Sequence, residues 1–481
     1  MKLKPIAFAA LACACAAGCR TTKDVLNDYE MNLSVGNYGG STQELLKLAD
    51  KKDGSELLWR LMAASTLQYS DSQETEAIRQ FDLAEAVLQK NDQTSVFAQG
   101  GEGTFAMLTN DKVFSYDGGG LDRVFTCVYR GIDFLCTSDR ENALVEFNRA
   151  AQYQRNWLYD RRKDIDAAAK KLESDAIAYQ KKQEAKEEHP SEAVNKAMED
   201  ESFCAQIREK TGFDPSASGN LDALSQSAYV NAYAAHLTGV FRWINGDNGL
   251  DDLKLAAAVK PDDTCIARDF AECEKSIMPT NQVWIWAEDG LCPVREEWRI
   301  DLPFILIPYA RRYIMYAGMA LPVLRERAYG AITWNAVTGD RTMPFEELES
   351  IDRLVRTEYD VYMRGALTRE ITRTLVRTGV QVGLGIAADN ASDRRTELAL
   401  RLSQIGTAAW AATCTAADIR SWTALPKRVM AVRLDRPADG VVQVVADGQT
   451  IPMTVPAGNS LVFIRKPAPS APPVVKIATF Q

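Results

Sequence analysis

The chain holds few residues of the types and spacings that enzymatic chemistry requires. Its 481 residues include only two histidines, His189 and His236, which lie 47 positions apart. Zinc hydrolases and Ser-His-Asp hydrolases need a histidine together with specific partners, so this scarcity argues against both classes. His189 precedes a proline in a charged stretch and is interpreted as solvated. His236 lies on an apolar helical stripe with no neighbouring metal ligands in the sequence, so we interpret it as a core or partner-facing histidine.

Two pairs of adjacent carboxylates are the remaining candidates for general acid–base chemistry. Glu296-Glu297 lies in a segment with strand character, and Glu346-Glu347 lies in a segment expected to be helical. Neighbouring side chains point to opposite faces of a strand and diverge by about 100° on a helix, so neither pair converges on one bond. Convergence of carboxylates from distant segments stays open, which makes an envelope hydrolase acting on the cell wall the alternative function. The main expectation is a protein that is not an enzyme and has no catalytic residue.

The other motifs do not indicate a cofactor or a metal. The glycines of GVQVGLGIA, residues 379–387, lack the strand–turn–helix context of a dinucleotide site and are attributed to close helix packing. No C-x-x-C pair occurs, which argues against zinc-ribbon and thioredoxin-like sites. The formal net charge of −9 argues against nucleic-acid binding, which needs clustered Lys and Arg. We therefore expect no cofactor, no metal and no nucleic-acid partner.

Covalent chemistry is expected at one position, Cys19. A basic start, with Lys2 and Lys4, leads into an apolar stretch that ends in Ala16-Ala17-Gly18-Cys19. This arrangement resembles the bacterial lipobox, in which a diacylglycerol is attached to the cysteine and cleavage occurs just before it. No other segment reaches 18 uncharged apolar residues, so the lipid would be the only membrane anchor. Arg20 stands where an inner-membrane retention signal usually has Asp, which favours an outer-membrane lipoprotein that faces the periplasm. The alternative is an ordinary signal peptide with incidental cysteines.

Seven further cysteines follow Cys19, and an oxidising periplasm would permit disulfides among them. Because seven is an odd number, at least one thiol is expected to be unpaired. Most of the seven cysteines are interpreted as small buried hydrophobic side chains. The seven are Cys127, Cys136, Cys204, Cys265, Cys273, Cys292 and Cys414.

Pairs of helices are the structural elements that would hold these residues in place. The segment from Tyr116 to Gln154 is predicted to form two antiparallel helices, with Ala143, Phe147 and Ala150 on one face of the second. The same Ala-x3-Phe-x2-Ala spacing begins at Ala77, and a third pair is predicted at 227–260, where Asp251 takes the place of the first alanine. Small residues around one aromatic ring allow close helix packing of the tetratricopeptide type, and such pairs need stacked neighbours.

The predicted fold is mainly α, with an irregular tetratricopeptide-like helical array, a small inserted β-sheet and a C-terminal β-rich module. Composition and periodicity divide the chain into seven parts. These are a signal peptide (1–18), a tether (19–40), a tetratricopeptide-like helical domain (41–280) with a charged helical arm (156–199), a mixed segment with short strands (281–343), a helical segment (344–417), a small β module (418–466) and a Pro-rich tail (467–481).

Four stretches together resemble an uncharacterised family of bacterial envelope lipoproteins with tetratricopeptide-like repeats. The stretches are NALVEFNRAAQ (142–152), NAYAAHLTGVFRWINGD (231–247), EDGLCPVREEWRIDLP (288–303) and DIRSWTALP (418–426). The resemblance implies a role in the envelope, in peptidoglycan or outer-membrane assembly, and it supplies no catalytic residues. The expected function is a lipid-anchored periplasmic scaffold or adaptor. Its expected partners are the membrane, through the N-terminal lipid, and another envelope protein.

Overall fold

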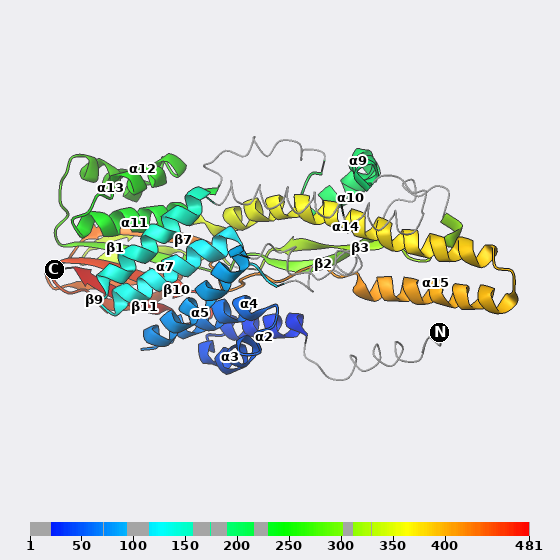
Figure 1. Ribbon diagram of the computed structural model, residues 1–481. Helices are drawn as coiled ribbons and strands as arrows, with labels where there is room; N and C mark the ends of the chain where they lie inside the picture. The colour runs from blue at the N-terminus through cyan, green and yellow to red at the C-terminus, as the bar shows by residue number, and fades with distance from the viewer. Residues whose placement is uncertain are drawn as a thin grey trace.

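The computed structural model describes residues 21–70, 72–93, 115–156, 174, 190–215, 229–301, 311–328 and 330–480. The predicted signal peptide, Cys19, His189 and most of the predicted charged arm lie outside these ranges. The fold is mixed and dominated by helix, with 54% of residues in helices and 19% in strands. The molecule is long, with a wide body at one end and a pair of long helices extending from it at the other (Figure 1). We call these two ends the body and the hairpin.

Helices form one layer of the body (Figure 1). The predicted pairs are helical, and Phe81 and Phe147 are fully buried together with their flanking alanines. A Cβ atom on Gly131 would lie 2.7 Å from the Phe147 ring, so the glycine allows the two helices to approach closely. The helices of this layer are α2 (Thr22–Ser34), α3 (Thr42–Ala49), α4 (Glu56–Gln68), α5 (Glu74–Gln93), α7 (Gly120–Cys136), the helical residues 140–156, α11 (Ala232–Ile244), α12 (Leu250–Val259) and α13 (Thr264–Glu274), with a 3-10 turn η1 at Tyr38–Gly40.

Two sheets form the other layers of the body. A five-stranded sheet has the order β11-β10-β1-β7-β6, in which β1 is parallel to β10 and antiparallel to β7. A four-stranded sheet has the order β5-β4-β8-β9. The strands are β1 (Gln282–Asp289), β4 (Trp334–Thr338), β5 (Arg341–Pro344), β6 (Glu346–Ser350), β7 (Arg428–Asp435), β8 (Val441–Ala446), β9 (Gln449–Thr454), β10 (Asn459–Lys466) and β11 (Val474–Phe480).

The prediction of a separate inserted sheet at 281–343 and a separate β module at 418–466 was wrong. β1 lies at the centre of the five-stranded sheet between two strands of the supposed module. Its residues alternate between two apolar cores. Val283 and Ile285 belong to the core shared with the four-stranded sheet, while Trp284 and Trp286 belong to the core under the helices. A strand buried on both faces needs a layer on each side, so the two segments fold as one unit.

Both segments predicted to be loosely attached are ordered parts of the body. Residues 19–40 were expected to be a tether, yet α2 begins at a capping box formed by Thr21 and Asp24 and buries Val25, Tyr29 and Leu33. The spacing of these three apolar residues at four-residue steps explains the helix. The tail at 467–481 was expected to be extended and mobile, yet its last part is the edge strand β11, antiparallel to β10. The two segments also touch, because the Tyr38 hydroxyl donates to the Pro472 carbonyl over 2.6 Å.

The hairpin consists of α14 (Ile351–Asp389) and α15 (Arg394–Cys414). At 1.5 Å per residue, the 39 residues of α14 extend about 58 Å. The predicted helical segment at 344–417 begins later than expected, because residues up to Ser350 pair with β7 and the Ser350 side chain caps α14. A strand pair and three short elements pack beside α14, namely β2 (Val294–Asp301), β3 (Gly318–Arg325), α9 (Pro190–Glu199), α10 (Glu201–Thr211) and the 3-10 turn η7 (Arg311–Tyr313). None of the described helices is long and apolar enough to cross a membrane.

The glycines of residues 379–387 were attributed from the sequence to close helix packing. The structure agrees at Gly385 and disagrees at Gly383. A Cβ atom on Gly385 would lie 2.5 Å from the Tyr313 ring and 2.8 Å from the Gln404 amide, so Gly385 permits the contact between α14 and α15. At Gly383 a Cβ atom would meet nothing within 4 Å. Close packing therefore explains Gly385 and does not explain Gly383.

Candidate functional site

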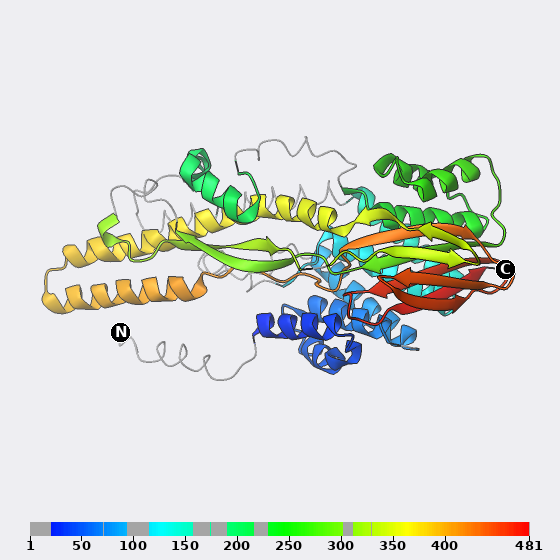
Figure 2. The ribbon, with the colours of Figure 1, turned by 180° about the vertical axis from the view of Figure 1, so that it is seen from behind.

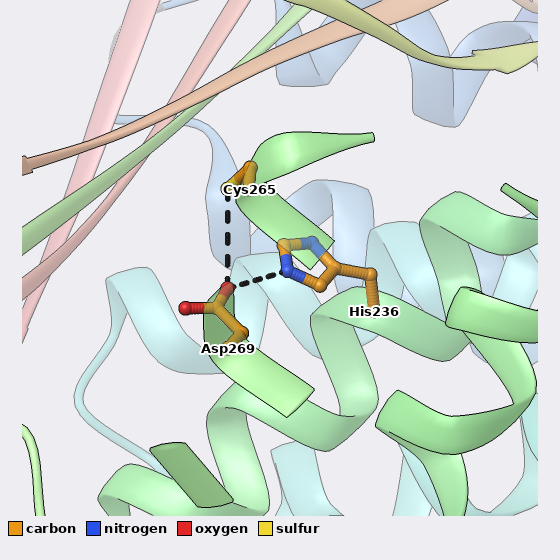
Figure 3. Close-up of side chains that lie close together, drawn as sticks. All are labelled: His236, Cys265 and Asp269. Carbon is orange, nitrogen blue, oxygen red and sulfur yellow. Dashed lines mark hydrogen bonds and ion pairs between the residues drawn. The ribbon is translucent and has the colours of Figure 1, made fainter. Parts of the chain in front are cut away.

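His236 lies in a buried polar cluster with Asp269 and Cys265 (Figure 3). The histidine comes from α11, and the other two residues lie one turn apart on α13. The His236 and Asp269 side chains are fully buried, and Cys265 is 7% exposed. The interpretation of His236 as a core residue is confirmed. The sequence around His236 showed no further residues of metal-ligand type, but α13 brings Cys265 and Asp269 to it from about 30 positions further along the chain.

The hydrogen bonds of the cluster assign one tautomer to His236. The indole nitrogen of Trp286 is only a donor, and it lies 3.3 Å from His236 Nδ1, which must therefore accept. The proton is then on Nε2, which donates to Asp269 Oδ2 over 2.7 Å. The same carboxylate oxygen accepts from the Trp284 indole at 3.0 Å, and the other oxygen accepts from Arg433 at 2.6 Å. Both histidine nitrogens and both carboxylate oxygens thus have partners.

This arrangement does not fit a metal ion. A metal on His236 Nε2 would move the proton to Nδ1, where it would face the Trp286 N–H group. Two ligands of one tetrahedral zinc lie about 3.4 Å apart, which is wider than the 2.7 Å between His236 Nε2 and Asp269 Oδ2. Arg433, 2% exposed, already supplies a positive charge to Asp269. Burial also raises the pKa of the Cys265 thiol well above its usual value, which disfavours a thiolate ligand. The cluster is best described as a neutral-histidine network that joins α11 and α13 to β1 and β7.

A second buried network joins the helices to the five-stranded sheet. The Arg465 guanidinium lies between the rings of Tyr69 and Tyr129, 4.3 and 4.4 Å from their centroids. It forms an ion pair of 2.7 Å with Glu288 and donates to the Gln68 amide oxygen over 2.9 Å. Burial raises the pKa of the Glu288 carboxyl, and the Arg465 charge opposes that rise.

The network continues to the edge of the sheet. Gln68 donates to Asp133, and Lys476 on β11 forms ion pairs with Asp133 and Glu74 at 3.2 and 3.1 Å. Burial raises the pKa of the Asp133 carboxyl to about 6. About 310 Å³ of open space lies beside Arg465 and Lys476. Because both cations are already paired with carboxylates, the space has no surplus charge with which to select an ionic ligand.

A third polar feature lies where α14 passes the start of α7. Glu358 on α14 accepts hydrogen bonds from the backbone N–H groups of Gly120 and Leu121 at 2.9 and 3.2 Å. A carboxylate is favoured there because the first N–H groups of a helix lack partners within the helix. About 340 Å³ of open space adjoins Glu358 and Asn231. The contact fixes α14 to the helical layer of the body.

In each candidate carboxylate pair, the two side chains contact different partners. Glu296 pairs with Arg325 at 2.7 Å, while Glu297 points elsewhere and accepts from the backbone of Ala417 at 3.0 Å. Glu346 and Glu347 were expected on a helix but lie on β6. Glu346 accepts from the backbone and hydroxyl of Thr264, whereas Glu347 lies 3.8 Å from Arg428. In each pair, one glutamate accepts a hydrogen bond from a neighbouring segment, and the other contacts an arginine.

None of the seven described cysteines is linked to another by a disulfide. Four of them are buried and the other three are half-buried. Burial raises the pKa of Cys127 and of Cys265 well above the usual value, so these thiols stay protonated at neutral pH. Their interpretation as small hydrophobic side chains agrees with this environment.

Three of the four large apolar side chains that are exposed on the hairpin lie on α15. Leu398, Leu402 and Ile405 are 59%, 59% and 51% exposed, at spacings of four and three residues. A different side of the same helix, about 110° around its axis, buries Gln404, Ala408 and Ala411 where α15 packs on α14. Large aliphatic side chains this exposed on one helical stripe are typical of a surface that binds another protein. This stripe was not predicted from the sequence, because 344–417 was treated as a single helical segment and α14 was not separated from α15.

Comparison of the chain with protein-family models, with curated proteins and with solved structures found no match. The resemblance to an envelope lipoprotein family therefore remains a prediction from the sequence.

Proposed function

We propose that this protein is a non-enzymatic scaffold or adaptor of the bacterial envelope. Lipid on Cys19 anchors it to the outer membrane, where it faces the periplasm and binds another envelope protein. In this proposal the helix pairs of the body are degenerate tetratricopeptide-like repeats. The role is in cell-wall or outer-membrane assembly, as the family resemblance implies.

The exposed stripe of α15 is the observation that carries this proposal. Leu398, Leu402 and Ile405 lie on the hairpin, which extends away from the body (Figure 2). The hairpin is fixed to the body at its base, where Ser350 caps α14 and Glu358 binds the start of α7. An anchored protein with an extended helical arm and an uncovered apolar face is suited to holding a second macromolecule away from its body.

The polar clusters support a scaffold rather than an enzyme. The His236 cluster has no exposed group, and the carboxylates around Arg465 are paired with cations. A general acid or base must reach the proton that it transfers, and the carboxylates of these clusters are held by the cations and hydrogen-bond donors around them. Within the described ranges, the polar groups buried in the body therefore act as connections between layers.

Two experiments test the proposal in intact envelopes. In fractionation, wild-type protein should remain with the membrane and the Cys19→Ala variant should appear in the soluble periplasmic fraction. In lysine-reactive crosslinking followed by purification of the lipidated chain, the same envelope protein should be recovered in repeated preparations. Membrane retention of the Cys19→Ala variant would overturn lipid anchoring. Recovery of no reproducible partner would overturn the scaffold function.

A further inference from the structure

The exposed face of α15 has the period of a coiled-coil seam. Its apolar residues follow one another at spacings of four, three, four and three, an average of 3.5 residues. The first three are large and more than half exposed, Ala409 is also exposed, and Ala412 is half-buried. We call this set the outer seam; it consists of Leu398, Leu402, Ile405, Ala409 and Ala412.

The outer seam is suited to another helix. A 3.5-residue period keeps a straight row of side chains facing a partner helix that lies alongside, whereas a surface for a loop has no need of such a period. From Leu402 to Ala417 the chain carries no charged residue, so α15 itself presents no charge to a partner helix over that length. α15 is therefore apolar on two sides, of which α14 covers one.

The distribution of side-chain size identifies that helix. Large residues occupy the first half of the outer seam and alanines occupy the second half. An antiparallel copy of the same helix would place Leu398 against the second copy's Ala409, and Leu402 against the second copy's Ile405. Large residues then meet small ones at both ends, and the two aliphatic layers meet at the centre. We propose that the outer seam binds α15 of a second copy of this chain, in an antiparallel arrangement.

The charges at the start of α15 agree with this pairing. Arg394 and Arg395 are exposed, and in the antiparallel register they lie beside Ala412 and Thr413 of the second copy. The carbonyl end of a helix favours a positive charge, so each copy would supply cations to the end of the other helix. The Arg395 stem would also cover the small Ala412 side chain.

The resulting assembly is a four-helix bundle with the two bodies at opposite ends. The hairpin extends from one end of the body, so two antiparallel hairpins would keep the bodies apart (Figure 2). The 21 residues of α15 provide a contact about 32 Å long, which is a small interface, so the association is weak in dilute solution. Anchoring in one membrane, which rests on the proposed function, raises the local concentration of the copies.

A volume exchange across the outer seam tests the register. We expect Leu398→Ala and Ala409→Leu each to weaken self-association of the full-length lipidated chain about tenfold or more, because one leaves a gap and the other overpacks. The double variant should recover most of the wild-type association, since each alanine then meets a leucine again. Sedimentation equilibrium in density-matched detergent measures the association constant. Both positions are exposed in the single chain, so the variants leave its core unchanged.

A second test places a charged side chain in the outer seam. Leu402→Asp should abolish self-association, and the control Ser403→Asp should retain it. Ser403 is exposed on the same helix but faces about 100° away. A double exchange that fails to recover association, or a Leu402→Asp variant that associates like wild type, would overturn the antiparallel pairing.

Photo-crosslinking from position 402 in intact envelopes separates this inference from the scaffold function. An adduct of twice the monomer mass supports pairing of two copies. An adduct with a different protein alone overturns the pairing and leaves the scaffold function standing. The absence of any protein adduct overturns the pairing and also removes the observation that carries the scaffold function.

Discussion

Replacement of Asp269 by Asn should destabilise the body more than any other conservative change in the His236 cluster. The Asp269 carboxylate is fully buried and accepts from His236, Trp284 and Arg433. Removing one partner of a buried ion pair costs about 3–5 kcal/mol. Because Arg433 keeps a contact of 2.7 Å with Glu272, we expect a loss near the low end, about 3 kcal/mol of unfolding free energy.

Cys265→Ser is the matched control for this change. The thiol lies 3.9 Å from Asp269, and a serine hydroxyl there could donate to the same carboxylate, so its cost should be below about 1 kcal/mol. Arg433→Met should also be destabilising, and the double variant with Asp269→Asn should cost less than the sum of the two. The shared ion pair makes the two losses non-additive.

Urea unfolding followed by tryptophan fluorescence is a suitable assay. Trp284 donates to Asp269, and Arg433 lies 4.9 Å from the Trp284 ring centroid, so the emission reports on this cluster. Zinc added to wild-type protein should leave the midpoint unchanged, since a ligand that binds the native state would raise it. A Cys265→Ser loss as large as that of Asp269→Asn, together with stabilisation by zinc in wild type alone, would refute the network and favour a metal site.

Two further predictions concern the Asp133 carboxyl and the hairpin glycines. The pKa of Asp133 is about 6 in the folded protein against an ordinary value of 3.8, so its contribution to stability is present below about pH 4 and lost as pH rises through 6. Asp133→Asn should remove that part of the slope, about 3 kcal/mol, when urea unfolding free energies are compared from pH 4 to pH 7; an unchanged slope would contradict the burial argument. Gly385→Ala should destabilise by about 1–3 kcal/mol because its Cβ would collide with Tyr313, whereas Gly383→Ala should stabilise by several tenths of a kcal/mol in the same assay. Equal effects of the two alanines would show that α14 and α15 do not pack as described.

Local patterns in the sequence predicted the helices well and the sheets poorly. The Ala-x3-Phe-x2-Ala spacing predicted buried helix pairs, and Phe81 and Phe147 are indeed fully buried. Strand character in β1 was visible from Trp284 and Trp286, but its neighbours in the sheet begin about 145 and 175 residues later. Pairing between such distant strands depends on register and on layers that no local window contains.

The candidate cluster at His236 was missed for a similar reason. Its polar neighbours come from α13 and from two strands, so the sequence around the histidine shows only an apolar stripe. The signal that was present is the spacing of Cys265 and Asp269, which places both on one face of α13. Two residues one turn apart on a helix point in the same direction, but their spacing does not show which residue elsewhere in the chain they contact.

Pairing through the outer seam explains why the sequence of α15 differs from that of a helix that packs against one neighbour only. A hairpin that packed only on itself would need apolar residues where Gln404, Ala408 and Ala411 face inward, and polar ones elsewhere. Instead, the outward positions carry Leu398, Leu402 and Ile405, while the buried face includes a glutamine whose amide donates to two backbone carbonyls. The large aliphatic side chains of α15 therefore lie on its outer side, and exposing them in water opposes solubility unless another surface covers them. The gradient from leucine to alanine along that side makes an antiparallel copy of the same helix the simplest cover.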